Sequence, residues 1–208
     1  MTEDRMKQKN KTALLLVVSA PSGAGKSTLC NRLIKKFPNM TYSVSCTTRR
    51  PRGAEKNNTH YHFLSREEFS ARANNGEFLE HAEVHGNFYG TLKQTVEDAL
   101  AEGRDIIMDI DVQGAAQIRE ACKKLSSEDP VRQGFVDVFI TAPSMEELRR
   151  RLCGRSTDTD DVIEKRLHNA KEEMKQHDRY QHVVINDDLD TALEKLTRMI
   201  EEEHRKRR

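Results

Sequence analysis

Residues 20–28 read APSGAGKST and follow, after one serine, the apolar run LLLVV at 14–18. An apolar strand, a glycine-bearing loop and Lys-Ser at the start of a helical pattern are typical of a phosphate-binding loop. Gly23 and Gly25 can adopt backbone angles closed to other residues, so that successive N–H groups point at phosphate oxygens beside a helix N-terminus. The stretch therefore predicts an α/β fold of the P-loop NTPase type with a nucleoside triphosphate site.

Ala20 stands where the strict motif has glycine. It falls at the end of the predicted strand, where we expect a small side chain to be tolerated, because the phosphate-facing amides lie further along the loop. We expect Lys26 to reach the β- and γ-phosphates and the Ser27 hydroxyl to hold Mg²⁺. A glycine-containing turn that precedes Lys-Ser by chance is the competing interpretation. The loop alone does not separate ATPases, GTPases and small-molecule kinases.

Apolar runs and helical patterns alternate along the chain, which predicts a largely parallel sheet flanked by helices. Buried strands are expected at 14–19, 105–111, 136–141 and 183–186. Helices are expected at 29–37, 114–125, 144–152 and 160–179. Between the first helix and the second of these strands, short alternating stretches are separated by NNG and HGN turns, and Ser65-x-x-Glu68 is a capping box. This region is predicted to be a small mixed-sheet subdomain inserted into the core.

The charge of the chain is balanced. Its 208 residues contain 35 Lys and Arg against 34 Asp and Glu, so no overall field attracts nucleic acid or a membrane surface, and neither partner is expected. No apolar run approaches the ~20 residues that span a bilayer. The four cysteines lack the spacing of a disulfide scaffold, which indicates reduced thiols in a cytoplasmic protein. A secretory signal is disfavoured because Glu3 and Asp4 precede a short apolar run.

Two carboxylates end the predicted strand at 105–111. Asp109 and Asp111 stand at the carboxyl end of a central parallel strand, where ligands of α/β sheets bind. One is expected to assist Mg²⁺, directly or through water, and the other to contact a second substrate. A strand-ending turn with solvated aspartates is the alternative.

The segment SCTTRRPRG at 45–53 concentrates arginines after a run of hydroxyl side chains. Guanidinium groups bind phosphate in bidentate fashion, and Pro51 stiffens the turn that presents them. Tyr61 and Tyr89 add neutral donors to the same phosphate. A nucleic-acid patch is a weak alternative, because only three arginines gather in a chain of near-zero net charge.

Six segments together resemble the guanylate kinase family in their order and spacing. They are APSGAGKST, SCTTRRPRG, GEFLEHAEVHGNFYGT at 76–91, DIDVQG at 109–114, RLCGRSTDT at 151–159 and VINDDLD at 184–190. The resemblance covers roughly residues 13–200 and implies transfer of the γ-phosphoryl group of ATP to GMP, giving ADP and GDP with Mg²⁺. Such a reaction serves guanine nucleotide synthesis and recycling. A monomer or small homo-oligomer is expected.

The resemblance also implies a division of this single domain. The expected parts are a core at 13–40, 92–148 and 168–200, a GMP-binding subdomain at about 41–91, a lid at about 149–167, and flexible tails at 1–12 and 201–208.

By the same resemblance, the GMP phosphate is bound by Arg49, Arg52, Tyr61 and Tyr89, helped by the Ser45 hydroxyl. The guanine base is bound by Glu80 and Thr91, with Asp109 or Asp111 nearby. Physical chemistry supports Glu80, because guanine offers two adjacent donors, N1–H and the 2-amino group, and one carboxylate accepts both. Adenine presents a lone pair to that carboxylate, a mismatch that costs ~10⁴-fold in specificity.

The donor side and the lid follow from the same family pattern. ATP is expected to contact Arg151, Asn186 and the loop residues Ala20, Pro21, Ser22, Gly23, Ala24, Gly25, Lys26, Ser27 and Thr28. Catalysis is expected to depend on Lys26, Arg49, Arg155 and Arg166, because phosphoryl transfer between two polyanions needs positive charge around the migrating group. Taken without the family pattern, the lid arginines are typical of solvated helix faces.

Two alternatives remain open at this stage. A kinase of another nucleoside monophosphate would share the loop and lid but would have no reason to pair Glu80 with Arg49 and Arg52. A catalytically inactive guanylate kinase-like interaction module would keep the fold. Such modules are expected to lack the loop lysine or the lid arginines, whereas this chain has Lys26, Arg155 and Arg166.

Overall fold

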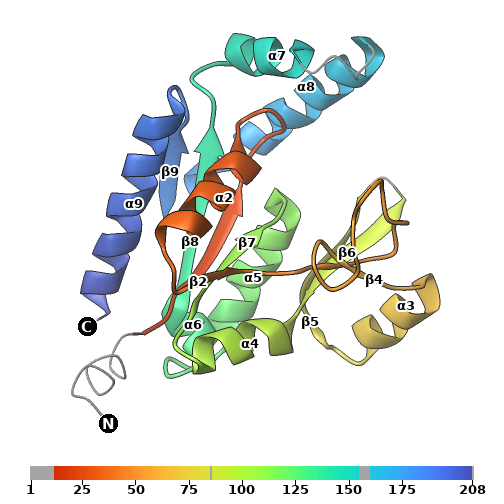
Figure 1. Ribbon diagram of the computed structural model, residues 1–208, viewed down its shortest axis with the longest axis vertical. Coiled ribbons are helices and arrows are strands. Elements are labelled where there is room, and N and C mark those ends of the chain that lie inside the picture. The colour runs from red at the N-terminus through yellow and green to blue at the C-terminus, as the bar shows by residue number, and fades with distance from the viewer. Residues whose placement is uncertain (1–11, 85, 155–159, 208) are drawn as a thin grey trace.

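The computed structural model describes residues 12–84, 86–154 and 160–207. Its core is a parallel sheet in the order β2-β7-β1-β8-β9 (Figure 1), which confirms the predicted fold class. The strands are β1 (Leu15–Ser19), β2 (Met40–Tyr42), β7 (Asp105–Asp109), β8 (Phe135–Thr141) and β9 (His182–Ile185). The predicted N-terminal tail, apart from residue 12, and Arg155 of the predicted lid lie outside the described residues.

Helices cover both faces of this sheet because its central strands are apolar on both sides. Leu16 and Val18 of β1 pack in one hydrophobic cluster, while Leu15 and Val17 pack in another on the opposite face. The first cluster includes side chains of α2 (Lys26–Lys36), α7 (Met145–Cys153), α8 (Asp160–Met174) and α9 (Leu189–Lys206). The second includes side chains of α4 (Lys93–Ala101), α5 (Val112–Lys124) and α6 (Pro130–Gly134). The carboxyl ends of the strands therefore remain open for a site.

A second, four-stranded sheet in the order β4-β3-β6-β5 forms the inserted subdomain, to the right in Figure 1. Its elements are β3 (Cys46–Thr47), β4 (His62–Phe63), α3 (Arg66–Asn74), β5 (Phe78–Val84) and β6 (Asn87–Leu92). The predicted capping box starts α3, with reciprocal hydrogen bonds between Ser65 and Glu68. Phe69 of α3 stacks on Phe78 of β5 with ring centroids 4.4 Å apart, so the subdomain has its own small core.

The boundary predicted at residue 41 falls inside a core strand. Met40–Tyr42 forms β2, which pairs with β7 at the edge of the parallel sheet. Three residues carry too little pattern to reveal which sheet they join. The subdomain sheet starts only at Cys46.

The structure differs from the prediction in a helix and in the C-terminal tail. The helix predicted over 160–179 stops at Met174, where the His177 ring donates to the Met174 carbonyl at 2.7 Å, and a 3₁₀ turn, η2 (His177–Arg179), follows. The C-terminal tail predicted at 201–208 is wrong for most of its length, because α9 continues to Lys206 and buries Glu203 and His204. Each of these two buried polar side chains has a partner in the structure.

The partner of His204 lies at the start of β7. His204 Nε2 lies 2.9 Å from Asp105 Oδ2, and Asp105 Oδ1 accepts the Leu14 N–H at 2.9 Å. Both side chains are about 95% buried. This contact fixes the C-terminal end of α9 to the start of β7, at the end of the sheet opposite the phosphate loop.

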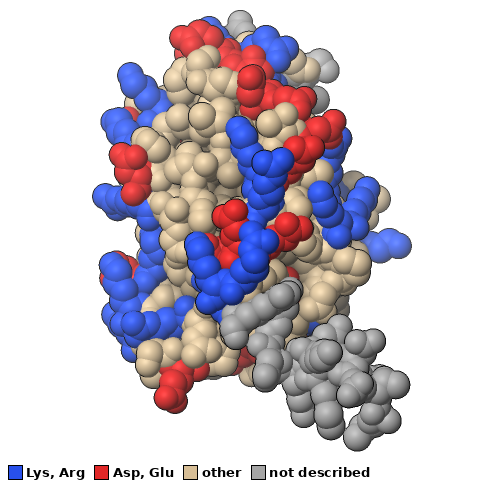
Figure 2. Space-filling model, turned by 90° about the vertical axis from the view of Figure 1, so that its left-hand side faces the viewer, with Lys and Arg blue, Asp and Glu red and all other residues tan. Residues whose placement is uncertain are grey.

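The surface charge is mixed on the face that carries α9. Figure 2 shows lysine and arginine side chains next to aspartate and glutamate around an uncharged area. Among the helices of the described residues, none combines the length and apolar character that a bilayer crossing requires.

Candidate active site

The loop between β1 and α2 is shaped by its glycines. Gly25 is the N-cap of α2 and has a φ of 86°, in the left-handed region that favours glycine. A Cβ at this position would lie 2.4 Å from the Asn186 side-chain nitrogen, so glycine is required for space as well. Ala20 packs against the hydrophobic core at the end of β1. Its side chain therefore takes a structural place, as the sequence suggested.

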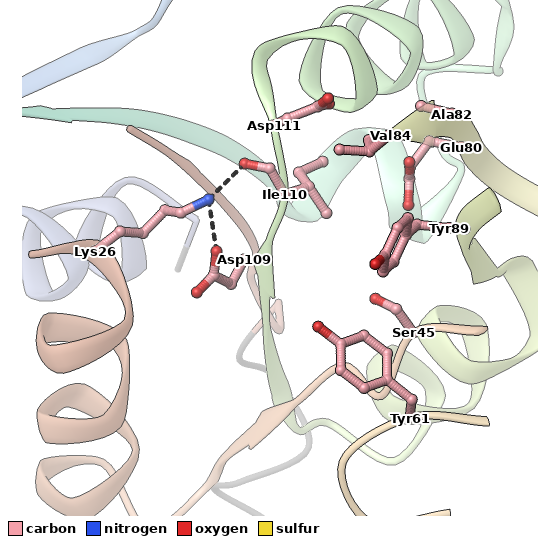
Figure 3. A pocket seen from close by; sticks show the side chains of 11 residues that line it. Lys26, Ser45, Tyr61, Glu80, Ala82, Val84, Tyr89, Asp109, Ile110 and Asp111 are labelled. Atoms are coloured by element: carbon pink, nitrogen blue, oxygen red, sulfur yellow. Dashed lines mark hydrogen bonds and ion pairs between the residues drawn. The ribbon is translucent and has the colours of Figure 1, made fainter. Parts of the chain in front are cut away.

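Lys26, Ser27 and Asp109 form one cluster at this loop. Lys26 Nζ lies 2.5 Å from Asp109 Oδ1 and donates to the Ile110 carbonyl at 2.8 Å (Figure 3). The Ser27 hydroxyl donates to Asp109 Oδ2 at 3.0 Å. The register of β1 with β7, which pairs Val18 with Asp109, brings this carboxylate beside the loop. Asp109 therefore lies beside the loop that is predicted to bind the triphosphate.

Asn186 contacts the loop, and Arg151 lies next to the segment that follows Asn186. Asn186 is 4% exposed and donates to the Ala24 carbonyl at 2.8 Å, so its amide braces the loop backbone. Arg151 donates to the Asp187 carbonyl at 3.3 Å and to Glu147 at 2.6 Å. The pKa of the Glu147 carboxyl is held at about 2 by Arg150 and Arg151. Both residues predicted for ATP thus gather at the end of β9.

A cavity of about 170 Å³ joins this cluster to the inserted subdomain. Figure 3 shows Lys26 and Asp109 on one side and Glu80, Tyr89, Tyr61 and Ser45 on the other. The lining residues are Lys26, Ser45, Tyr61, Glu80, Ala82, Val84, Tyr89, Gly90, Asp109, Ile110 and Asp111. A phosphate loop and a second set of polar groups therefore share one cleft.

Glu80 is the buried carboxylate of this cleft. Its exposed fraction is 5%, and burial raises the pKa of its carboxyl to about 7; Thr91 opposes this shift and Asp111 adds to it. Thr91 stands opposite Glu80 on β6. Its buried hydroxyl lies close enough to Glu80 to lower the pKa of that carboxyl, but it makes no hydrogen bond of ordinary geometry within the described part of the chain. Asp111 caps α5 by accepting the Gly114 N–H at 2.8 Å.

Arg49 lies at the other end of the subdomain face. Its guanidinium lies 5.2 Å from the Tyr61 ring centroid, and the Tyr61 and Tyr89 rings are 6.1 Å apart. Both guanidinium Nη atoms donate to the carboxylate of Glu55, at 2.9 and 3.0 Å. Arg52 is exposed and does not line the cavity; its backbone N–H donates to Glu55 at 2.7 Å. Neither arginine is among the residues that line the cavity, and Arg49 is the one that contacts a tyrosine ring.

Comparison with known proteins gives these groups a context. A family model described as guanylate kinase matches residues 12–203. The chain belongs to the guanylate kinase family.

Curated relatives and a solved structure support the assignment. The chain is 45% identical to a guanylate kinase of Geobacter metallireducens over 190 residues, which is 91% of this chain and 89% of that protein. It is 47% identical to a guanylate kinase of Dechloromonas aromatica over 186 residues, 89% of this chain and 87% of the relative. The crystal structure of guanylate kinase from Anaplasma phagocytophilum matches with a TM-score of 0.72 at 35% identity, covering 93% of this chain and 87% of the other.

Sequence reasoning missed two acidic residues of this guanylate kinase site. Glu55 follows SCTTRRPRG by two positions, and its spacing of three from Arg52 was the available signal. Glu173, on α8, lines a second hollow with Asp111. Burial raises the pKa of the Glu173 carboxyl, while Lys26 lowers it. Nothing in the surrounding sequence marks Glu173, because the helix α8 is rich in charge throughout.

The lid predicted for the guanylate kinase pattern is described only in part. Arg166 lies half-buried on α8, whereas Arg155 falls outside the described residues. Helix α7 lies against the phosphate loop, since a Cβ at Gly23 would contact Leu152 at 3.2 Å. Movement of α7 would therefore change the packing of the loop around Gly23.

Proposed function

We propose that the chain transfers the γ-phosphoryl group of ATP to GMP, giving ADP and GDP. The observation that carries the proposal is the single cleft that has Lys26 at one end and the buried Glu80 at the other. A donor phosphate held by the loop then faces an acceptor whose base is held on the subdomain side of the same cleft. The reaction serves guanine nucleotide synthesis and recycling.

On the donor side, the loop from Ala20 to Thr28 binds the phosphates of ATP. Its N–H groups and the N-terminus of α2 supply positive potential, and Lys26 exchanges Asp109 for the β- and γ-phosphates. Arg151 lies beside ATP from α7, and Asn186 keeps the loop in its binding conformation.

Mg²⁺ enters this scheme with ATP. The described residues hold no cluster of three metal-ligating side chains. This fits Mg²⁺, which usually takes one or two protein oxygens together with phosphates and water. The Ser27 hydroxyl and the Asp109 carboxylate, 3.0 Å apart, are the groups that would hold it. Bound there, the ion would neutralise negative charge on the phosphoryl group during its transfer.

On the acceptor side, Arg49, Tyr61, Tyr89 and the Ser45 hydroxyl bind the GMP phosphate, and Arg52 joins when the subdomain closes on it. Ionised Glu80 accepts N1–H and the 2-amino group of guanine, and the Thr91 hydroxyl gains the partner it lacks. Asp111 lies near the base. A pKa of about 7 means that binding the two guanine donors draws Glu80 into its charged form.

The transfer step itself needs placement and charge more than covalent chemistry. Lys26 and Arg49 hold the two phosphates from opposite sides of the cleft, and Arg155 and Arg166 of the lid add positive charge as the site closes. Closure also excludes water, which would otherwise accept the phosphoryl group.

We place the enzyme in the cytoplasm, as a monomer or small homo-oligomer that needs no nucleic acid or membrane. The four cysteines support a reducing compartment: all are free, and three of them are buried.

The deciding experiment is a coupled assay of ADP formation with ATP·Mg²⁺ and GMP, AMP, UMP or CMP in turn. GMP is expected to be turned over at ~1–100 s⁻¹, the usual range of kinases, and the other three far more slowly. Equal turnover of AMP and GMP would point to a kinase of another nucleoside monophosphate. No turnover of any of the four, with GMP binding retained, would identify an interaction module.

A further inference from the structure

Helix α5 touches the carboxylate of Glu80 at a glycine. A Cβ built on Gly114 would lie 2.8 Å from Glu80 Oε2 and 3.4 Å from Glu80 Cδ. The backbone does not require glycine here, since Gly114 sits inside α5 and is not among the residues of positive φ. The only thing the missing side chain provides is room for Glu80 and, to a smaller extent, for Ile110 Cδ1 at 3.2 Å.

The helix and the strand are held together around this contact. The side chain of Gln117, one turn after Gly114, accepts the His81 N–H at 3.1 Å and donates to the His81 carbonyl at 2.8 Å. Asp111 fixes the Gly114 N–H from the other side at 2.8 Å. Neither α5 nor β5 can therefore retreat without losing hydrogen bonds. A new atom at position 114 would displace the free end of the Glu80 side chain, which is the movable part.

We propose that Gly114 is a specificity-determining positioning residue for the acceptor base. Its bare Cα sets the depth at which the Glu80 carboxylate sits, so that both oxygens face the N1–H and 2-amino donors of guanine. The inference rests on the proposed GMP site. A contact of 2.8 Å is 0.6 Å shorter than the 3.4 Å at which ordinary van der Waals contact begins, so an alanine forces the carboxylate to shift or rotate. One of two paired hydrogen bonds is then lost.

The test is Gly114→Ala, with steady-state kinetics for both substrates. The KM for GMP is expected to rise by about tenfold or more, because small misplacements of a binding group have effects of this order. The KM for ATP stays within about twofold, and the preference for GMP over AMP falls by the same factor as the GMP affinity. The melting temperature does not fall, since alanine is a better helix former than glycine.

Two further variants distinguish the inference from its alternatives. Glu120→Ala, on the exposed side of the same helix, is the matched control and should leave the KM for GMP unchanged. In a Glu80→Gln background, Gly114→Ala should add little further loss if it acts through the carboxylate. A full additional loss there, or an unchanged KM for GMP in the single variant, would overturn the inference.

A folding failure of Gly114→Ala is also informative. Glu80→Asp withdraws the carboxylate by one methylene group and relieves the contact, so the double variant should recover the melting temperature. Continued unfolding of the double variant would overturn the assigned contact. A wild-type chain that does not turn over GMP would instead refute the proposed function and leave the distance between Gly114 and Glu80 as it is.

Discussion

Both Nη atoms of the Arg49 guanidinium donate to the carboxylate of Glu55, at 2.9 and 3.0 Å. Arg49 is 9% exposed, and it also donates to the Arg50 carbonyl at 2.8 Å. The pKa of the Glu55 carboxyl is lowered to about 2, chiefly by Arg49, so this anion persists at physiological pH. The arginine that we propose to bind the GMP phosphate is therefore oriented in the ligand-free protein by a residue of its own loop.

Replacing Glu55 should weaken GMP binding. Glu55→Gln keeps the shape of the side chain but removes the charge that holds the guanidinium, and we expect the KM for GMP to rise about tenfold while the KM for ATP is unchanged. Glu67→Gln, at an exposed position in the first turn of α3, is the control. A lower KM for GMP would show that Glu55 competes with the phosphate instead of orienting Arg49.

Lys26→Met should reduce kcat by about 10³-fold, because the charge that faces the migrating phosphoryl group is lost. GMP binding, measured by calorimetric titration without ATP, should remain. Lys35→Met, in the last turn of the same helix, serves as the control and should keep wild-type kcat. Comparable activity of the two variants would remove Lys26 from the mechanism.

Glu80→Gln should weaken the selectivity for GMP over AMP while ATP binding survives. Glutamine presents one acceptor and one donor to the guanine edge, so one of the two donor groups of guanine meets an N–H instead of an oxygen. The measurement is the ratio of kcat/KM for GMP and AMP, with the KM for ATP as internal reference. A ratio equal to that of the wild type would exclude the role assigned to Glu80.

GMP binding should strengthen as pH rises through 7. With a Glu80 pKa of about 7, the ionised fraction increases about tenfold between pH 6 and pH 8, and the KM for GMP falls accordingly. The phosphate of GMP also titrates near pH 6, so Glu80→Gln is measured in parallel to isolate the contribution of the carboxyl. Identical pH profiles in the two chains would contradict the prediction.

The same carboxyl has the opposite effect on stability. Its pKa is raised by folding, so its contribution to the free energy of unfolding is complete below the unfolded value near 4.5 and is lost as pH rises through about 7. The free energy of unfolding of the ligand-free protein is therefore lower at the pH where GMP binding is expected to be strongest.

Asp105→Ala should lower the free energy of unfolding by about 3 kcal/mol, because it leaves His204 and the Leu14 N–H buried without a partner. His204→Ala should cost less, since Asp105 keeps its bond to Leu14. Arg205→Ala, at an exposed position one residue further along α9, should stay within about 0.5 kcal/mol of wild type. Urea unfolding gives all three values, and equal losses for the three would contradict the prediction.

The parts of the fold that the sequence predicted are those with strong local patterns. Strand β1 and the loop before Lys26 are read from consecutive residues, and the end of β7 at Asp109 follows from one apolar run. The three residues of β2 carry no such pattern, because their sheet is decided by pairing with β7, more than sixty positions away. The burial of His204 was missed because its partner, Asp105, lies 99 positions away in sequence.

The site shows the same division. Arg49 and the two tyrosines were predicted from residue types that suit phosphate, whereas Glu80 was predicted from the resemblance to the guanylate kinase family. Glu55 and Gly114 were missed because their importance lies in what they touch: one orients an arginine, and the other leaves space for a carboxylate. The sequence around a glycine within a helix does not indicate which atom occupies the space that a side chain would take.

The pairing of Lys26 with Asp109 has a consequence for which anions the protein retains. With Lys26 paired to Asp109 and Ser27 donating to the same carboxylate, the resting loop offers free inorganic phosphate or sulfate its N–H groups but not its lysine. A triphosphate that arrives with its own divalent cation can offer Asp109 a replacement for Lys26 and offer Lys26 a replacement for Asp109 in one exchange. The resting loop thus favours a phosphate compound that carries a divalent cation over the simple anions that are abundant in a cell.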